Sequence, residues 1–321
     1  MHSISAAAPG KMILFGEHAV VYGRPAIAAP VLQLEARVSV SANHAGRATR
    51  ILAPDIGLDA ELNELDEQHP LAAAIRLVCA VLEVMRLPPC TVKISSSIPV
   101  ASGLGSGAAV SVALLRALPA FLGHPLPESE VCKLAYEIEK IHHGTPSGID
   151  NTVITYARPV YFIKNEKRGN SIEPLAVGRS FTIVIGDTGI ASPTALAVGE
   201  VRKAWQTDPT HFEALFDSAG AIAQSARHAI ENGAIELLGP LMDANHGALR
   251  KMGVACNELD LLVSAARRAG AWGAKLSGAG RGGNMIALCA AEEAEGIAQA
   301  LRSAGAARAI ITTVQENRPE R

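Results

Sequence analysis

Residues 98–118 read I-P-V-A-S-G-L-G-S-G-A-A-V-S-V-A-L-L-R-A-L, and no other part of the chain is as informative. A strand-like run, Thr91–Ser95, leads into a loop with three glycines, and the Ala/Leu/Val pattern behind them predicts a helix to about Phe121. Glycines let backbone N–H groups approach an anion closely, and the helix directs the positive end of its dipole at the same place. The loop therefore favours a phosphate site, and the alternative is a tight turn that packs a helix onto a sheet.

The loop does not match the two best-known nucleotide signatures. No Lys-Ser/Thr pair follows the glycines, so it is not a Walker A loop. The spacing G-x-G-x-x-A at Gly103–Ala108 fits a loose dinucleotide fingerprint. A ribose contact would need an acidic residue at the end of a second strand about 20 residues later, and none is placed there.

Length and composition limit the class of protein. A chain of 321 residues is long enough for two domains, since domains average on the order of 150 residues, and the polar residues 165–180 mark the expected boundary. Apolar residues make up 49% of the chain, yet no apolar run is long enough to span a bilayer. The first residues lack the pattern of a signal peptide. We therefore expect a cytoplasmic protein with no membrane partner.

Charge and cysteine usage exclude further classes. The net charge is −2 and no Lys/Arg block or aromatic-studded basic stripe occurs, so no nucleic-acid partner is expected. The cysteines are odd in number and scattered through apolar runs, which predicts reduced thiols rather than disulfides or a zinc site. They are Cys79, Cys90, Cys132, Cys256 and Cys289.

Hydrophobic periodicity predicts mixed elements along the whole chain. Strands are expected at residues 6–8, 26–31, 35–41, 91–95, 181–186, 273–276, 285–289 and 309–314. Helices are expected at residues 71–85, from the end of the glycine loop at 107 to about 121, and at residues 128–142, 195–205, 211–231, 234–247, 258–269 and 291–303.

Two other segments carry charged residues suited to chemistry. In Ala8–Gly23, Lys11 follows a Pro-Gly turn and could hold a phosphate, although a surface Lys at a strand end is the alternative. Glu139 lies at the edge of an apolar helical stripe, and Asp150 follows the turn 144–148 on what is expected to be an irregular segment. Such a carboxylate pair can divide its work between holding a metal and accepting a proton. His142 and His143 face different ways on a helix, so a His-ligated metal is not favoured.

A second glycine loop lies late in the chain. Residues 275–285 read K-L-S-G-A-G-R-G-G-N-M, in which Gly278, Gly280 and Gly283 match G-x-G-x-x-G. A strand rather than a helix is expected to follow, so the dinucleotide context fails. A hairpin loop whose backbone approaches a ligand fits better.

Three motifs occur in order along the chain and together resemble the GHMP kinases, the family of galacto-, homoserine, mevalonate and phosphomevalonate kinases. They read P-G-K-x-I-L-x-G-E-H-x-V-V-Y-G, P-x-x-S-G-L-G-S-G-A-A and K-L-S-G-A-G-x-G-G. Within it, E-K-I-H-H-G-T-P-S-G-I-D-N and G-D-T-G-I-A-S-P-T resemble the branch that phosphorylates mevalonate. The resemblance implies an α+β fold of two domains. Residues 1–172 would resemble ribosomal protein S5 domain 2, residues 173–321 would be ferredoxin-like, and ATP and mevalonate would bind in the cleft between them.

The resemblance also implies roles for single residues. Asp150 would take the proton from the 5-hydroxyl of (R)-mevalonate, Lys11 would favour the ionised Asp150 and draw in the phosphoryl group, and Thr194 would lie near the site. Glu139 and Ser106 would ligate Mg²⁺. The ATP phosphates would be bound by Ser102, Gly103, Leu104, Gly105, Ser106, Gly107 and Ala108. Mevalonate would be bound by Glu17, His18, Gly278, Ala279 and Gly280. A homodimer is expected.

Two positions depart from the family pattern. The second Ser of G-L-G-S-S-A-A, a Mg²⁺ ligand in the family, is Gly107 here, and the late loop carries Arg281 and Asn284 where small residues are commoner. Arg281 keeps open a phosphomevalonate kinase, and a mevalonate 3-kinase is a further alternative. Gly107 keeps open a non-catalytic nucleotide-binding homologue. Because Lys11, Glu139 and Asp150 are all retained, an active kinase is expected.

Overall fold

The computed structural model describes residues 3–43, 46, 48–67, 69–100, 102–143, 146–165 and 169–317. The chain divides into two compact units that interleave along the sequence. Unit 1 comprises Met1–Gly10, Leu34–Pro99 and Gly105–Ala157, and unit 2 comprises Lys11–Gln33, Val100–Leu104 and Arg158–Arg321. Two long strands, β1 (Ser3–Phe15) and β2 (Pro25–Ala42), contribute residues to both units.

Unit 1 is a sheet covered by helices. Its strands follow the order β4-β3-β5-β2, with β1 pairing β2, and the elements added here are β3 (Arg50–Ala53), β4 (Leu58–Glu61) and β5 (Cys90–Ser96). The pair β3–β5 is parallel, whereas β3–β4 and β2–β5 are antiparallel. Along β5 the side chains of Cys90, Val92 and Ile94 are buried and those between them are not. This alternation is the pattern of a strand with one face toward a core.

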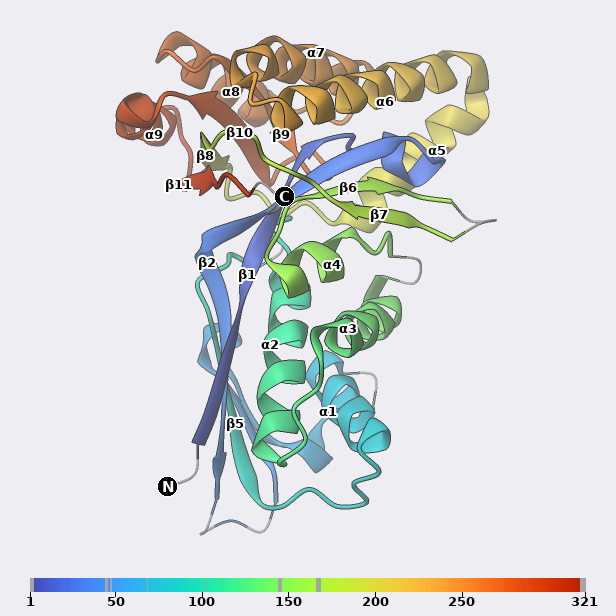
Figure 1. Ribbon diagram of the computed structural model, residues 1–321, viewed down its shortest axis with the longest axis vertical. Coiled ribbons are helices and arrows are strands. Elements are labelled where there is room, and N and C mark those ends of the chain that lie inside the picture. The colour runs from blue at the N-terminus through green and yellow to red at the C-terminus, as the bar shows by residue number, and fades with distance from the viewer. Residues whose placement is uncertain are drawn as a thin grey trace. The chain divides into compact units, whose positions relative to one another are not determined.

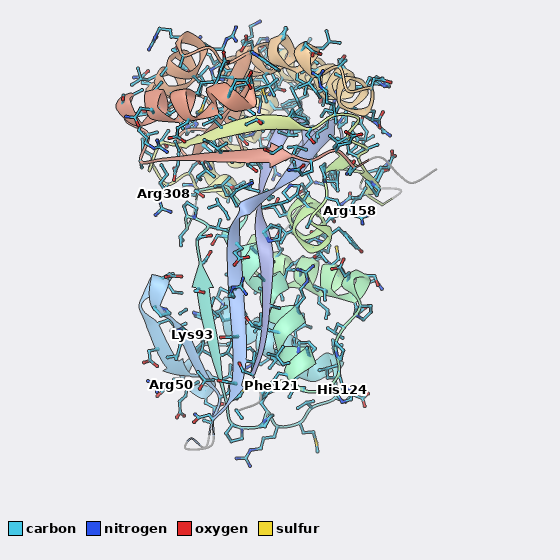
Figure 2. All side chains as sticks on the ribbon, turned by 60° about the vertical axis from the view of Figure 1, so that its left-hand side comes forward. Arg50, Lys93, Phe121, His124, Arg158 and Arg308 are labelled. Carbon is cyan, nitrogen blue, oxygen red and sulfur yellow. The ribbon has the colours of Figure 1, made fainter. Side chains whose placement is uncertain are left out.

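The helices of unit 1 are α1 (Pro70–Val81), α2 (Ser106–Phe121), α3 (Glu128–His143) and α4 (Ile149–Tyr156). Helix α2 contacts the other three, as Figure 1 shows. It is built of Ala, Leu and Val and is buried on most sides, because it is the central helix of this unit. Figure 2 shows Phe121, the last residue of α2, near the lower end of unit 1 in that view.

Unit 2 has a four-stranded antiparallel sheet with the order β11-β8-β10-β9. The strands are β8 (Phe181–Asp187), β9 (Gly273–Ser277), β10 (Asn284–Cys289) and β11 (Arg308–Val314). Helices separate β8 from β9 and β10 from β11, while β9 and β10 form a hairpin, so the chain follows the β-α-β-β-α-β pattern of a ferredoxin-like fold.

The helices of unit 2 are α5 (Thr194–Thr207), α6 (Pro209–Glu231), α7 (Leu238–Lys251), α8 (Asn257–Arg268) and α9 (Ala294–Ser303). Helices α7, α8 and α9 pack on the sheet, and α6 packs on α7 (Figure 1). A second set of strands pairs the first part of β2 with β6 (Val160–Ile163), and β6 with β7 (Ser171–Pro174). Short 3₁₀ turns are η1 (Ala19–Tyr22), η2 (Pro54–Ile56), η3 (Leu62–Glu64), η4 (Ile235–Leu237) and η5 (Ala291–Glu293).

The α+β fold and most expected elements are confirmed, and the differences have local causes. Helix α1 ends at Val81 rather than residue 85, because Glu83 has a positive φ of 54° that a helix cannot contain. Strand β1 extends well beyond the expected residues 6–8, and β2 joins the strands expected at residues 26–31 and 35–41 into one. The cysteines are all free, as expected. Within the described residues, no helix is both long and apolar enough to cross a membrane.

Candidate functional site

The expected site residues form two groups, one in each unit. Unit 1 holds Gly105–Ala108, Glu139 and Asp150, and unit 2 holds Lys11, Glu17, His18, Ser102–Leu104, Thr194 and Gly278–Gly280. Each group is described within its own unit. Residues 144 and 145 of the turn before Asp150, and the side chains of His142 and His143, lie outside the described part of the chain.

Lys11 is a residue of β1, and its side chain is 6% exposed. Its backbone N–H donates to the carbonyl of Leu104 at 2.9 Å, which ties the start of the glycine loop to the strand. Both the Pro-Gly turn and the alternative of a surface Lys are therefore wrong. A buried ammonium on a rigid strand is a fixed point charge of the kind that holds a phosphate.

The glycine loop before α2 is open. Gly103 and Gly105 have φ of 85° and 76°, and apart from chain neighbours and the helix's own backbone, no heavy atom of the described residues lies within 4 Å of a Cβ built on Gly103 or Gly107. Ser106, Gly107 and Ala108 form the first turn of α2, whose N–H groups have no acceptor within the helix. An open backbone in front of a 16-residue helix is the geometry that binds phosphate.

The first arm of this loop is held against β10. Asn284, 1% exposed, donates from Nδ2 to the carbonyl of Ser102. The neighbouring Gly283 comes so close that a Cβ there would lie 3.1 Å from the same carbonyl oxygen. Asn284, noted in the sequence only as a departure, therefore anchors the loop.

Glu139 and Asp150 are both half-buried and lie on contacting helices of unit 1. Asp150 is the second residue of α4, behind the cap Gly148 with its φ of 91°, so the expected irregular segment is wrong. The first turn of a helix is a favourable place for an acidic side chain, because the positive end of the helix dipole lies there. Figure 1 shows α3 and α4 beside α2.

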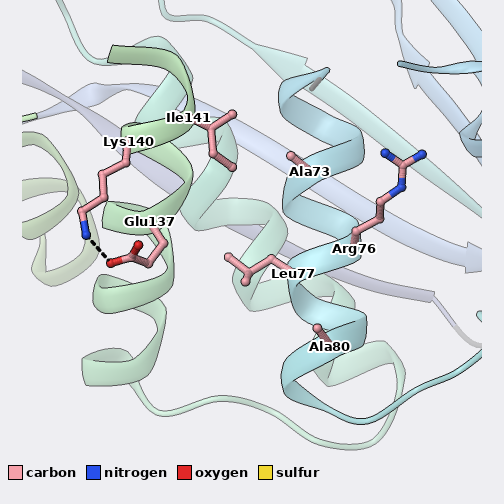
Figure 3. Close-up of a pocket in the computed structure, with 7 residues that line it drawn as sticks. All are labelled: Ala73, Arg76, Leu77, Ala80, Glu137, Lys140 and Ile141. Carbon is pink, nitrogen blue, oxygen red and sulfur yellow. Dashed lines mark hydrogen bonds and ion pairs between the residues drawn. The ribbon is translucent and has the colours of Figure 1, made fainter. Parts of the chain in front are cut away.

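A groove between α1 and α3 contains none of the expected residues. Figure 3 shows its lining, in which Lys140 is paired with Glu137 at 2.7 Å and Ile141 faces Leu77. Helical spacing places Glu139 and Ile141 on opposite edges of the buried stripe of α3. The groove is therefore separate from the candidate site.

Glu17 is locked in the core of unit 2. It is 1% exposed and receives hydrogen bonds from Lys275 Nζ on Oε1 and from Asn245 Nδ2 on Oε2, the latter at 3.1 Å. Lys275 and Asn245 were given no role by the sequence analysis. A signal existed for Lys275, since a Lys inside an apolar strand such as Ala271–Leu276 needs a buried partner.

His18 contacts the late glycine loop directly. Its Nε2 hydrogen-bonds the carbonyl of Ala279 at 2.9 Å, and its Nδ1 is buried with no hydrogen-bond partner among the described residues. Burial lowers the pKa of His18, the Ala279 bond partly opposes this, and the charge of Arg281 lowers the pKa further. The imidazole is therefore neutral near pH 7 and has one nitrogen left for a ligand.

The late loop, Gly278–Gly283, is the expected hairpin between β9 and β10, and most of it is tightly packed. A Cβ on Gly280 would lie 2.1 Å from the Val254 carbonyl oxygen, and Ser192 donates to the Gly280 carbonyl. Gly278 is open. Arg281 pairs with Glu200 of α5, so its charge is matched. Thr194, the first residue of α5, is exposed.

The donor atoms available suit Mg²⁺. The described residues contain no cluster of three or more His, Cys, Asp or Glu able to hold a metal. A Glu139 carboxylate and a Ser106 hydroxyl are hard oxygen donors, and Mg²⁺ typically takes one or two carboxylates together with substrate phosphates and water. The residues present fit a nucleotide-bound Mg²⁺.

Comparison with known proteins identifies relatives along the chain. Residues 71–158 match the GHMP kinases N terminal domain, and residues 226–307 match the GHMP kinases C terminal domain. The chain is 39% identical to the mevalonate kinase of Thermococcus sibiricus, covering 94% of this chain and 93% of that protein. It is 37% identical to that of Pyrococcus horikoshii, with coverage of 98% and 96%.

Solved structures agree with these relatives. The crystal structure of L. major mevalonate kinase in complex with R-mevalonate superposes with a TM-score of 0.84 at 32% identity and covers 98% of this chain and 97% of that one. The Methanococcus jannaschii mevalonate kinase superposes with a TM-score of 0.82 at 26% identity, covering 97% and 98%.

Proposed function

Since this chain belongs to the GHMP kinase family, we propose that it transfers the γ-phosphoryl group of ATP to the 5-hydroxyl of (R)-mevalonate, giving 5-phosphomevalonate. The observation that carries this proposal is the likeness to proteins named mevalonate kinase over 94–98% of the chain. One structural relative at 32% identity was crystallised with R-mevalonate.

In this proposal the open loop holds the ATP phosphates. The N–H groups of residues 103–108 and the dipole of α2 offer positive potential to the anion, and Lys11 adds a fixed charge. Phosphoryl transfer needs little covalent chemistry from the protein, so positioning and charge carry most of the catalysis. Glu139 and Ser106 would hold Mg²⁺, which would neutralise charge on the phosphates.

Asp150 is the proposed base. It accepts the proton of the substrate hydroxyl as that oxygen attacks phosphorus, and it lies in the first turn of α4. Thr194 is proposed to lie near the reacting groups. His18 presents its Nδ1 to the hydroxy-acid substrate, and Gly278, Ala279 and Gly280 shape the same pocket. The sequence also placed Glu17 in this pocket, but its two oxygens are bound in the core, so its part in the pocket is indirect.

Further properties complete the proposal. The partners are ATP and mevalonate, with neither nucleic acid nor membrane, and the enzyme works in the cytoplasm as a homodimer. The modest net charge of −2 supports the absence of a nucleic-acid partner.

A coupled ADP-release assay across mevalonate, phosphomevalonate, homoserine and galactose tests the function. We expect Mg²⁺-dependent turnover with mevalonate alone, and phosphorus NMR of the product should show a phosphate on the 5-oxygen. Turnover with phosphomevalonate, or a product phosphorylated on the 3-oxygen, would replace the assignment with a sister kinase. Nucleotide binding without turnover of any substrate would support the non-catalytic homologue.

A further inference from the structure

The most deeply buried charges of the described chain form one network in unit 2. Lys275 on β9 is 0% exposed and Glu17 is 1% exposed. Lys275 Nζ donates to Glu17 Oε1 and to the carbonyl of Leu276, the latter at 2.6 Å. Asn245 of α7, also 0% exposed, donates to the second Glu17 oxygen. Both oxygens of one carboxylate are therefore occupied by buried donors.

Stability alone is a weak reason for such a pair. Removing two charges from water costs about as much as their attraction returns, and well-packed apolar residues often serve a core equally well. A buried pair does, however, fix the geometry of the two segments that carry it, because either charge left alone is very costly.

The two segments joined here both lead into the proposed substrate pocket. Ser277 Oγ donates to the carbonyl of Ile13 at 2.8 Å, and the Lys275–Glu17 pair joins the same two segments. The His18 contact with the Ala279 carbonyl, at 2.9 Å, comes last. The ion pair is thus one of three cross-links between residues 13–18 and 275–279.

His18 needs this support. Its φ of 60° with a ψ of −50° is a positive-φ conformation that a non-glycine residue adopts only at a cost, and such strain persists only where the surroundings enforce it. The residue immediately before it is Glu17, whose side chain is held at both oxygens.

We propose that Lys275 and Asn245 are positioning residues, which clamp Glu17 and thereby hold His18 against the Gly278–Gly280 loop in the arrangement that binds the hydroxy-acid substrate. The inference rests on the proposed function. It makes Glu17 act through His18 rather than by touching the substrate, since both Glu17 oxygens are used inside the core.

The test uses the double variant E17Q/K275M. K275M alone leaves a charged Glu17 unpaired in the core and is expected to unfold the protein, whereas the double variant removes both charges, keeps the length at position 17 and shortens the side chain at 275 by one atom. We expect the melting temperature to stay near that of the wild type. KM for mevalonate should rise about tenfold or more, while KM for ATP stays unchanged, because a small misplacement of a binding group is enough to cost this much.

Two further variants complete the design. N245L removes one of the two donors to Glu17 and should raise KM for mevalonate in the same direction by less. The matched control is R179M/E236Q, which removes an exposed ion pair of the same unit and should change neither KM. A folded double variant with unchanged KM for mevalonate would overturn the inference.

A readout independent of turnover separates this inference from the proposed function. The ¹⁵N resonances of His18 are followed against pH by NMR in the wild type and the double variant. We expect the His18 pKa to rise in the double variant as the ring loosens and meets water. If the wild type does not phosphorylate mevalonate but His18 responds in this way, the proposed function fails and the clamp stands. If His18 titrates identically in both proteins, the clamp fails.

Discussion

The two glycine-rich loops share the sequence pattern G-x-G-x-G, but glycine is needed in them for opposite reasons. In the loop before α2, Gly103 and Gly107 have open space where a Cβ would be. In the loop between β9 and β10, Gly280 and Gly282 press against the carbonyls of Val254 and Ile190. The glycines of the first loop leave its N–H groups open to a ligand, as the proposed function requires. The second is bare mainly because the protein's own backbone fills the space, and only Gly278 is open there.

This contrast predicts a division of labour. Under the proposed function, the open loop, Glu139 and Asp150 would handle phosphate, metal and proton, whereas the packed loop and His18 would recognise the substrate. Substitutions on the first side should change kcat or metal dependence, and substitutions on the second should change stability or KM for mevalonate.

The largest effect is expected for Asp150→Asn. Asparagine keeps the size of the side chain but cannot accept a proton, and loss of a general base costs roughly 10²–10⁴ in rate. Steady-state kinetics should show kcat falling by this factor with little change in ATP affinity. Retention of more than about a tenth of wild-type kcat, outside that range, would place the base elsewhere.

Gly280→Ala should be the most damaging change for stability. The new Cβ would lie 2.1 Å from the Val254 carbonyl oxygen at a φ of 76°, so overpacking of about 1–3 kcal/mol adds to backbone strain. Gly278→Ala is the matched control, because its φ of 91° is equally strained but its space is open. Thermal melts of both variants compare the two, and equal losses would show that packing is not what this loop requires.

Sequence reasoning could distinguish the two loops only by the element that follows each one. A helix was predicted to follow the loop with Gly103, Gly105 and Gly107, and α2 begins within that loop, at Ser106. The strand after residue 283, the resemblance and the α+β fold are confirmed. What periodicity could not supply was tertiary: that Lys11 is buried in a long strand, and that the first turn of a short helix carries Asp150. The pairing of Lys275 with Glu17 spans 258 positions, and no local pattern encodes it.

Glu139→Gln tests whether the open-loop side holds the metal. With Gly107 in place of the family's usual Ser, Glu139 is expected to carry most of the protein's share of Mg²⁺ binding. The Mg²⁺ concentration for half-maximal rate should rise on the order of tenfold, a typical cost of losing a group that supports a metal. The control is Glu137→Gln on the same helix, which removes only the pair with Lys140. An unchanged Mg²⁺ dependence in Glu139→Gln would mean that the metal is held in another way.

The stability of unit 2 should also depend on pH. Burial lowers the pKa of His246 below the ordinary 6.5, partly opposed by Asp260 and strengthened by Lys275. The unfolded chain therefore binds the proton first, so this contribution to stability is complete above pH 6.5 and is lost as pH falls below it toward the folded pKa. His18, with its pKa also lowered by burial, adds to the same trend.

Melting temperatures between pH 7.5 and 5.5 measure this dependence. His246→Gln should flatten the curve, whereas His228→Gln, at an exposed position of α6, should leave it unchanged. A His246→Gln curve parallel to the wild type would mean that other groups titrate in this range.

The smallest effect is expected for Gly107→Ser, which restores the hydroxyl of the family pattern. A backbone that needed a positive φ would make any side chain costly here, yet Gly107 is a residue of α2 outside the left-handed region. Apart from its chain neighbours and its own helix backbone, no described heavy atom lies within 4 Å of its Cβ position. Serine is also a better helix residue than glycine by a few tenths of a kcal/mol. The variant should therefore melt at or slightly above the wild-type temperature and need the same or modestly less Mg²⁺.

Gly103→Ala, with its φ of 85° and equally open space, should lose about 1 kcal/mol from strain alone. If Gly107→Ser were destabilised as much as Gly103→Ala, the open loop would be less tolerant than its geometry implies, and the contrast with the packed loop would lose its basis.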